Sequence, residues 1–247
     1  MASKYFAPGE QRAAKVGDLF AAIARRYDLI NDLQSFGLHR LWKRRLIRLA
    51  HVRPGERALD LCCGTGDVAF ALARAGVEVA GLDFSEPMLE VAQERFKVQG
   101  LVRFLKGDAQ HLPFSDATFD VVTISYGLRN LADWEKGLRE MLRVAKPGGR
   151  LLVLDFGKPP NATWRKIYFA YLGGFVPLFG KLFCGDAAAY AYILESLKHF
   201  PAQESIAANM RALRCDDVRV VNLLGGVMGI TFGRKPAGSE QRWSVSS

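Results

Sequence analysis

The sequence predicts an α/β fold: a mostly parallel, seven-stranded sheet with helices on both faces and a C-terminal antiparallel hairpin. Between residues 57 and 156, short apolar runs alternate with amphipathic helical stretches. Strands joined by helical crossovers pair in parallel, and the crossovers cover both faces of the sheet. Near the C-terminus, two further apolar runs lie close together and are joined through Gly225-Gly226, which predicts a hairpin.

The N-terminal part, residues 11–50, predicts helices. A polar break at Asn31-Asp32 separates a first helical stretch from a second one between about Gly37 and Leu49, and Pro54-Gly55 marks a turn. We interpret residues 1–50 as a helical cap. One apolar stripe of the first helix recurs at spacings of three and four residues: Val16, Leu19, Phe20, Ile23 and Tyr27.

The central part carries five runs of strand length and three helices between them. The predicted strands are Arg57–Leu61, Val77–Leu82, Val102–Leu105, Phe119–Ile124 and Arg150–Phe156. The predicted helices are Val68–Ala75, Pro87–Val98 and Trp134–Val144. The run Lys146-Pro147-Gly148-Gly149 predicts a sharp stop between the last helix and the fifth strand.

The C-terminal part departs from this alternation. Residues 158–184 are aromatic and irregular, and residues 186–213 predict helix with an interruption near Pro201. We expect a helical insertion over about residues 158–213 within a main domain of residues 51–235. The strands Val218–Leu223 and Val227–Phe232 form the predicted hairpin, and the polar tail 236–247 is predicted to be disordered.

The formal net charge of +9 does not by itself indicate a nucleic-acid partner. No zinc finger or other nucleic-acid-binding motif accompanies the basic residues, so we predict no nucleic-acid partner. The densest basic patch lies on the second predicted helix: Arg40, Lys43, Arg44, Arg45 and Arg48.

The cysteines indicate a reducing, cytoplasmic compartment. Two are adjacent and two are isolated, a pattern that fits neither a disulfide framework nor zinc-ligand spacing: Cys62, Cys63, Cys184 and Cys215. We expect no metal. The N-terminal residues lack the apolar core of a signal peptide, and the longest apolar segment, Ile167–Gly180, is too short to span a membrane.

The most informative stretch is Leu59–Asp67, which leaves a predicted strand and enters a helix. Glycines at such a turn let the backbone approach a ligand, and the helix N-terminus offers unpaired N–H groups. A dinucleotide-binding fingerprint would need a third glycine where Ala69 stands. An acidic residue, Asp83, does follow at the distance expected of a carboxylate that binds a ribose diol.

The charges around this turn favour S-adenosylmethionine over a nicotinamide nucleotide. Asp60 precedes the glycines and Asp67 follows them, and two carboxylates oppose a pyrophosphate but suit a cationic ligand. S-adenosylmethionine carries a sulfonium, an ammonium and a ribose, and no phosphate. Asp108 ends the third predicted strand, where it can accept from the adenine amino group. These carboxylates fall at the carboxyl ends of strands, where open α/β sheets bind ligands.

Several motifs together resemble one family. The chain is similar to the Rossmann-like class I methyltransferases and, more narrowly, to the ubiquinone and menaquinone biosynthesis C-methyltransferases. The resemblance covers roughly residues 16 to 235. The motifs are Tyr27-Asp28-x-x-Asn31-Asp32, Ser35-x-Gly37-x-His39-Arg40-x-Trp42-Lys43, Leu59–Asp67, Tyr126-Gly127-Leu128-Arg129-Asn130, Arg143-Val144-x-Lys146-Pro147-Gly148-Gly149 and Tyr190-x-Tyr192-x-x-x-Ser196-x-x-x-Phe200-Pro201.

The resemblance implies methyl transfer from S-adenosylmethionine to a ring carbon of a prenylated hydroquinone. The run Gly225–Gly229 stands where many members carry a histidine after a glycine-containing turn, and it is more similar to the phylloquinone-type branch. We therefore favour a demethylmenaquinol or demethylphylloquinol over a methoxybenzoquinol. From the motifs and the resemblance together, the expected cofactor residues are Asp60, Gly64, Thr65, Gly66, Asp83, Phe84, Asp108, Ala109 and Ser125.

Loss of a hydroxyl proton makes the ring carbon more nucleophilic, so a base or a cation near the ring is useful. Arg129 is the first candidate to stabilise a phenolate, and the alternative is that it pairs with Asp28 or Asp32. Tyr126 either contacts the ring or packs. Two histidines are candidate bases, His39 and His199.

The aromatic stretch Tyr168–Phe179 is expected to line a channel for the prenyl tail or to form the core of the helical insertion. With Lys166 and Lys181 it would also make transient contact with the inner face of a membrane. The oligomeric state stays open, a homodimer included. The competing functions are methylation of another lipid or metabolite, a non-enzymatic scaffold and nucleic-acid methylation.

Overall fold

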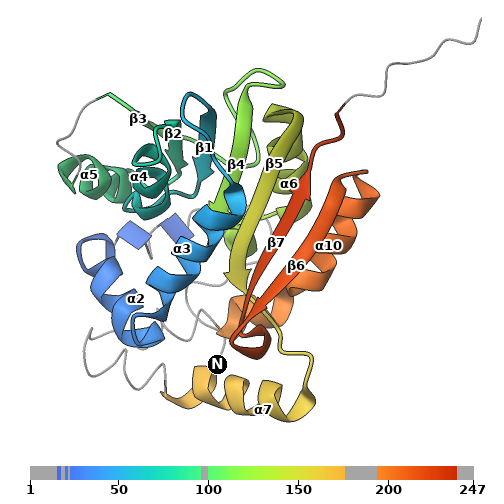
Figure 1. Cartoon of the computed structure of the whole chain (residues 1–247). Helices are drawn as coiled ribbons and strands as arrows, with labels where there is room; N and C mark the ends of the chain where they lie inside the picture. The colour runs from blue at the N-terminus through green and yellow to red at the C-terminus, as the bar shows by residue number, and fades with distance from the viewer. Residues whose placement is uncertain (1–15, 18–19, 22, 96–99, 176–193, 238–247) are drawn as a thin grey trace, which may run out of the picture.

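The computed structural model describes residues 16–17, 20–21, 23–95, 100–175 and 194–237 (Figure 1). Their helices are α2 (Tyr27–Ser35), α3 (Leu38–Ala50), α4 (Asp67–Ala73), α5 (Glu86–Arg95), α6 (Trp134–Val144), α7 (Ala162–Ala170) and α10 (Ala202–Ala212). Short helical turns are η1 (Ala24–Arg26), η2 (Leu128–Asn130), η3 (Tyr171–Phe175) and η4 (Leu224–Gly226).

Seven strands of the described chain form one sheet in the order β3-β2-β1-β4-β5-β7-β6. Neighbours among β1 to β5 pair in parallel, whereas β7 runs antiparallel to both β5 and β6. The predicted mostly parallel sheet with a C-terminal antiparallel hairpin is therefore confirmed. The strands are β1 (Arg57–Leu61), β2 (Glu78–Asp83), β3 (Val102–Lys106), β4 (Phe119–Ser125), β5 (Ala145–Phe156), β6 (Asp216–Leu223) and β7 (Met228–Arg234).

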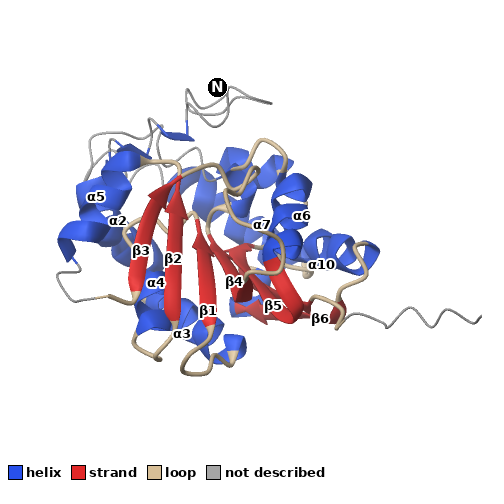
Figure 2. Ribbon diagram, turned by 90° about the horizontal axis from the view of Figure 1, so that it is seen from above, coloured by secondary structure: helices blue, strands red, loops and turns tan. Residues whose placement is uncertain are grey.

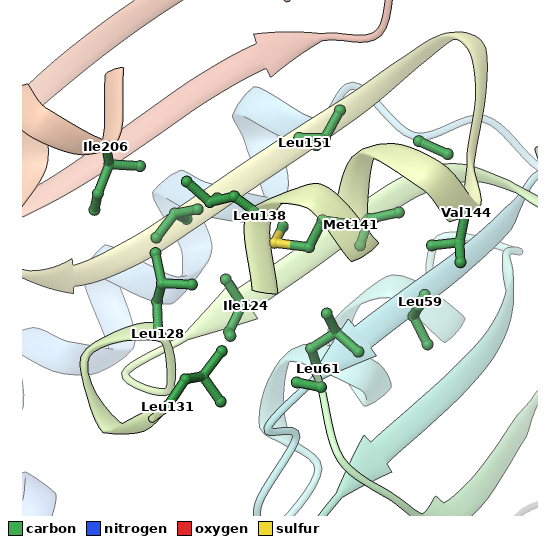
Figure 3. Close-up of a cluster of buried hydrophobic side chains, with 14 of the residues drawn as sticks. Leu59, Leu61, Ile124, Leu128, Leu131, Leu138, Met141, Val144, Leu151 and Ile206 are labelled. Atoms are coloured by element: carbon green, nitrogen blue, oxygen red, sulfur yellow. The ribbon is translucent and has the colours of Figure 1, made fainter. Parts of the chain in front are cut away.

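Helices cover both faces of the sheet (Figure 2). Successive side chains of a strand point to opposite faces. Ala58 of β1 therefore packs in the core cluster that holds Leu46 of α3, while Leu59 packs in the cluster that holds Met141 of α6. Figure 3 shows the second cluster, in which α6 lies over β1, β4 and β5. Each fully buried leucine of these clusters contributes about 1.5–3 kcal/mol to folding.

The register aligns the ends of the strands that precede the site. Leu61, the last residue of β1, pairs with Leu82 of β2 and with Ile124 of β4. The loops that follow these strands consequently leave the sheet at one edge, which is where a doubly wound sheet binds its ligands.

Two segments differ from the predicted elements. Within the expected helical insertion, residues 158–184 were expected to be aromatic and irregular, but Ala162–Ala170 form α7; the Asn161 side chain caps it, accepting from Trp164 N at 2.9 Å. The predicted stop at Lys146-Pro147-Gly148-Gly149 does end α6, but these residues already belong to β5. The Gly148 N–H donates to the Lys235 carbonyl and the Lys235 N–H donates to the Gly149 carbonyl, so these residues pair with the chain that follows β7.

Some expectations fall outside the described residues: the first part of the cap with Leu19, the lysine and cysteine at 181 and 184, and the tail from 238 on. The boundaries at residues 50 and 235 stay predictions. None of the helices in the described ranges combines the length and apolar character needed to cross a bilayer.

Candidate active site

A cavity of about 730 Å³, part of it open to solvent, lies where β1, β2, β3 and β4 end. Its walls come from the loops after these strands, from the start of α5 and from the N-terminal segment. They are Val16, Gly17, Phe20, Tyr27, Cys62, Gly64, Leu82, Asp83, Phe84, Ser85, Met88, Gly107, Asp108, Ala109, Gln110, Ser125, Tyr126, Gly127, Asn130 and Leu131.

The conformation of the glycine turn after β1 is stabilised by hydrogen bonds to a carboxylate. Gly64 has φ 54° and Gly66 has φ 86°, values that favour glycine. Asp83 accepts from the backbone N–H of Gly64 at 2.8 Å and from that of Ser85 at 2.9 Å. Burial raises the pKa of Asp83 although these N–H groups oppose the shift. The same side chain therefore fixes the turn and lines the cavity.

Asp60 lies behind the turn and not in the cavity wall. Its side chain is buried and accepts from the Thr123 hydroxyl at 2.8 Å. Burial raises the pKa of Asp60 to about 7, because the Thr123 hydroxyl, the charge of Lys43 and the Ala69 N–H together compensate only part of the lost hydration. Near neutral pH this carboxyl is thus divided between its charged and its protonated form.

Asp67 is not free to attract a cationic ligand, which corrects the argument from charge. Lys43 donates to it at 2.8 Å and Arg95 at 3.0 Å. Burial raises its pKa, but the two cations outweigh that effect and leave the pKa below its ordinary value. Arg95 also donates to Asp28 at 2.6 Å, and Thr65 donates to the same carboxylate at 3.0 Å. These ion pairs tie the N-terminal helices to the glycine turn.

Six of the expected cofactor residues line the cavity: Gly64, Asp83, Phe84, Asp108, Ala109 and Ser125. The other three, Asp60, Thr65 and Gly66, lie behind it and shape the turn. The Ser125 hydroxyl is buried and has no hydrogen-bond partner among the described residues. An orphaned hydroxyl and two carboxylates around one cavity fit a ligand with amino and hydroxyl groups, as S-adenosylmethionine has.

The structure adds one feature that the sequence analysis missed. Cys62 has φ 50° and lines the cavity. A Cβ atom on Gly127 would lie 2.4 Å from the Cys62 Cβ, so this glycine makes the room that the strained cysteine needs. Burial raises the pKa of the Cys62 thiol well above its ordinary value, which keeps it an unreactive thiol.

A second cavity of about 500 Å³ adjoins the first at Tyr126, which lines both. It is largely aromatic and draws on α2, α3, α7, η3 and the ends of β4, β5 and β7. Its walls are Asn31, Gln34, Ser35, His39, Trp42, Tyr126, Phe156, Tyr168, Tyr171, Leu172, Val227 and Met228.

Tyr126 is held between the cavities by a buried ion pair. Arg129 donates to Asp155 at 2.8 Å and to the Tyr126 carbonyl at 2.6 Å, and its guanidinium lies 4.6 Å from the centre of the Phe156 ring. Arg129 thus pairs with Asp155 and not with Asp28 or Asp32, which bind Arg95 and Arg40. Neither Arg129 nor Asp155 is among the residues that line these two cavities, so a direct contact of Arg129 with a phenolate stays a prediction.

The two candidate bases lie in different surroundings. His39 is 3% exposed and lines the second cavity. His199 is exposed, lies 3.0 Å from the Glu195 carbonyl and lines neither cavity. In the described part of the chain, no three His, Cys, Asp or Glu residues form a group that could hold a metal ion.

The model of the ubiE/COQ5 methyltransferase family matches residues 9–235. A ubiquinone/menaquinone biosynthesis C-methyltransferase UbiE of Azotobacter vinelandii is 46% identical over 235 residues, 93% of each chain. A demethylmenaquinone methyltransferase of Desulfitobacterium hafniense is 42% identical and covers 92% of each chain.

Solved structures show the same fold at lower identity. A SAM-dependent methyltransferase of Thermotoga maritima has a TM-score of 0.63 at 21% identity, over 88% of this chain and 99% of its own. Phosphoethanolamine N-methyltransferase 2 of Haemonchus contortus, solved with S-adenosyl-L-methionine, has a TM-score of 0.60 at 18% identity. That match covers 79% of this chain and 52% of the other.

Proposed function

Because the chain belongs to the ubiE/COQ5 methyltransferase family, we propose that it methylates a ring carbon of a prenylated naphthoquinol, a demethylmenaquinol or demethylphylloquinol. It is an S-adenosylmethionine-dependent methyltransferase of quinone biosynthesis.

The observation that carries the proposal is the meeting of two unlike cavities at Tyr126. The first has carboxylates and a glycine turn at the strand ends, which suits S-adenosylmethionine. The second has aromatic and apolar walls, which suit a flat ring with a hydrocarbon tail. Two reactants held in adjoining cavities are aligned for transfer before the chemical step.

S-adenosylmethionine, when bound, supplies an activated methyl group on its sulfonium. Asp83 and Asp108 would accept from its ribose and adenine, and the orphaned Ser125 hydroxyl would bond its polar end. The walls of the second cavity would exclude water from the ring, which protects the activated methyl group from hydrolysis.

Two residues of the second cavity support the naphthoquinol ring. Val227 and Met228 lie in the run that carries no histidine, and both line this cavity. An apolar wall suits the unsubstituted second ring of a naphthoquinol better than the methoxy oxygens of a benzoquinol, which would lose hydration there.

The test is a methyl-transfer assay with labelled S-adenosylmethionine and two short-tailed acceptors, a demethylnaphthoquinol and a demethylated methoxybenzoquinol. We expect kcat/KM to be at least tenfold higher for the naphthoquinol, with the label on ring carbon by mass spectrometry. A higher value for the benzoquinol would contradict the ring assignment. Transfer to neither ring, with the cofactor still bound in calorimetry, would contradict the quinol proposal.

We also propose transient contact with an anionic membrane surface, from which a prenylated substrate would enter. Figure 1 shows α2 and α7 at the end of the sheet to which β5 points, and Tyr171 after α7 donates to the Gln34 carbonyl at 2.9 Å. Phe36 and Ile167 are exposed large apolar side chains of this region. We expect co-sedimentation with anionic vesicles and not with neutral ones; no binding to either would contradict it. A homodimer stays a prediction.

A further inference from the structure

The second cavity has a polar corner that the methyl-transfer assignment leaves unused. Asn31 and Ser35 of α2 and His39 of α3 form this corner, and Tyr126 lines the same cavity. Burial raises the pKa of Tyr27, and the Asn31 amide near its hydroxyl opposes part of that rise. Asn31 Nδ2 itself is buried, with no partner at hydrogen-bond distance among the described residues. Tyr126 Oη is buried without one as well. Buried polar groups are normally paired, so these atoms point to a polar ligand.

We propose, on the basis of the function proposed above, that the hydroquinone ring binds in the second cavity and that His39 Nε2 accepts its hydroxyl proton. The hydroxyl is the one beside the ring carbon that receives the methyl group. His39 is then a catalytic residue, and Ser35 and Asp32 are positioning residues.

The hydrogen bonds of Ser35 fix the tautomer of His39. The Ser35 hydroxyl donates its one proton to the Asn31 carbonyl at 2.6 Å. Toward His39 it therefore accepts, both from the backbone N–H at 3.2 Å and from Nδ1 at 3.0 Å. Nδ1 must carry the hydrogen, so Nε2 holds the free electron pair. No described residue bonds Nε2, and the ring belongs to the cavity wall.

No other described side chain of the wall can take a proton near neutral pH. Besides His39, the wall consists of aromatic, amide, hydroxyl and apolar side chains, without a carboxylate, lysine or arginine. Burial raises the pKa of all three wall tyrosines, Tyr126, Tyr168 and Tyr171, so they stay protonated. Asparagine, glutamine and serine do not accept protons in this range.

The charges around His39 suit a base that works at neutral pH. Burial lowers the pKa of His39, Lys43 and Arg40 on α3 lower it further, and Asp32 on α2 and Asp67 on α4 oppose them. The net pKa lies below the ordinary value, so the imidazole is neutral at pH 7. Asp32 Oδ1 lies 3.6 Å from Nδ1 and stabilises the imidazolium once the proton has arrived.

The proton balance is complete within the proposed reaction. The O–H bond breaks, its proton binds Nε2, and the electron pair on oxygen raises the density at the neighbouring ring carbon. That carbon bonds the methyl group while the methyl–sulfur electron pair stays on sulfur. The ring C–H bond then breaks, its electron pair restores the aromatic ring and the negative charge on oxygen, and His39 returns its proton to that oxygen. The C–H proton passes to bulk solvent when the product leaves the cavity. One proton is released for each methyl group transferred.

The experiment compares His39→Asn, Ser35→Ala and the wild-type protein. An asparagine keeps an amide beside Ser35 but has no basic nitrogen. We expect His39→Asn to bind S-adenosylmethionine within twofold of wild type by calorimetry and to lose about 100- to 1,000-fold in kcat. In the pH profile of kcat, the acid limb, which is the fall at low pH that protonation of His39 causes, should disappear. His51→Asn, at the far exposed end of α3, is the matched control and should change neither.

A second readout does not need turnover. With labelled histidine, NMR should show His39 as the Nδ1–H tautomer, and a bound quinone without ring hydroxyls should shift its Nε2 signal. Ser35→Ala should move the titration of His39 and the acid limb by the same amount. A His39→Asn enzyme with kcat within threefold of wild type and an intact acid limb would overturn the role of His39 while leaving the proposed function standing. A wild-type enzyme that methylates neither quinol would overturn both.

Discussion

The two cavities differ in how the chain builds them. The first is assembled from loops that directly follow β1, β2, β3 and β4, and in its glycine turn Asp83 accepts hydrogen bonds from backbone N–H groups. The second is assembled from side chains of segments as distant in sequence as Asn31 and Met228. A cofactor site of the first kind tolerates little change in the backbone. A substrate site of the second kind can change its shape through single side chains.

The cavities also differ in the buried carboxyl behind each. Asp155, behind the second, forms an ion pair with Arg129, whereas Asp60, behind the first, has no hydrogen-bonded cation among the described residues and accepts from the Thr123 hydroxyl. Removing one member of a buried ion pair strongly lowers the free energy of unfolding, because the other charge is left unpaired. A buried carboxyl without a cation makes the free energy of unfolding depend on pH, because its pKa differs between the folded and the unfolded state.

The largest expected effect comes from breaking the ion pair. Asp155→Asn leaves the Arg129 guanidinium buried without its counter-charge, so we expect a loss of about 3–5 kcal/mol in the free energy of unfolding, measured in urea. Because the pair supports Tyr126 and Phe156, the KM for the quinol should rise more than the Kd for the cofactor. Arg139→Gln, in a half-exposed ion pair, should cost less than about 1 kcal/mol. Equal losses in the free energy of unfolding for the two variants would show that the buried ion pair contributes no more to stability than an exposed one.

The next effect is a pH dependence set by Asp60. Its folded pKa of about 7 exceeds the unfolded value of 3.8, so between these values the folded state holds a proton that the unfolded state releases. Stability should therefore fall as pH rises from 4 to 7, by on the order of 3 kcal/mol relative to Asp60→Asn.

Asp120 provides a control of opposite sign for the Asp60 measurement. Burial raises its pKa, but Lys146 and the Arg57 N–H outweigh burial and hold the pKa below its ordinary value. Its contribution is consequently lost as pH falls, so the difference between wild type and Asp120→Asn should slope the other way. Urea unfolding of the ligand-free proteins at several pH values checks both, and parallel slopes would refute the assignment of Asp60.

A smaller effect tests the cofactor turn. Asp83→Asn places an amide NH₂ against one of the two N–H donors that the carboxylate now accepts from. We expect S-adenosylmethionine affinity to fall about 30- to 100-fold in calorimetry, equivalent to about 2–3 kcal/mol. Glu86→Gln, three residues further on and exposed, should leave the Kd unchanged. A Kd within threefold of wild type for Asp83→Asn would show that the turn holds without its carboxylate.

The smallest effect is the coupling between Cys62 and Gly127. Gly127→Ala puts a methyl group 2.4 Å from the Cys62 Cβ and should destabilise the protein by about 1–3 kcal/mol. In a Cys62→Gly background the same change should cost about 1–2 kcal/mol less, because the opposing atoms are gone. A double-mutant cycle in urea measures this difference, and additive effects would disprove the contact.

The sequence by itself determined the order of strands and helices in the central part and the cofactor turn. Apolar periodicity and glycine punctuation are local signals, which is why the predicted β1 and α6 match the structure residue for residue. Asp83 was identifiable because a βαβ unit fixes its distance from the glycines. Even so, the charge argument for Asp67 was wrong, since its partner Arg95 lies 28 residues away.

Only the tertiary structure decided which residues surround the acceptor. Arg129 pairs with Asp155 across the ends of β4 and β5, and the packing of the N-terminal helices places His39 in the same cavity as Tyr126. The sequence analysis named both His39 and His199 as candidate bases, because the sequence does not show how buried each imidazole is or which groups it contacts. Contacts between distant segments depend on how whole elements pack, and no local pattern in the chain records that packing.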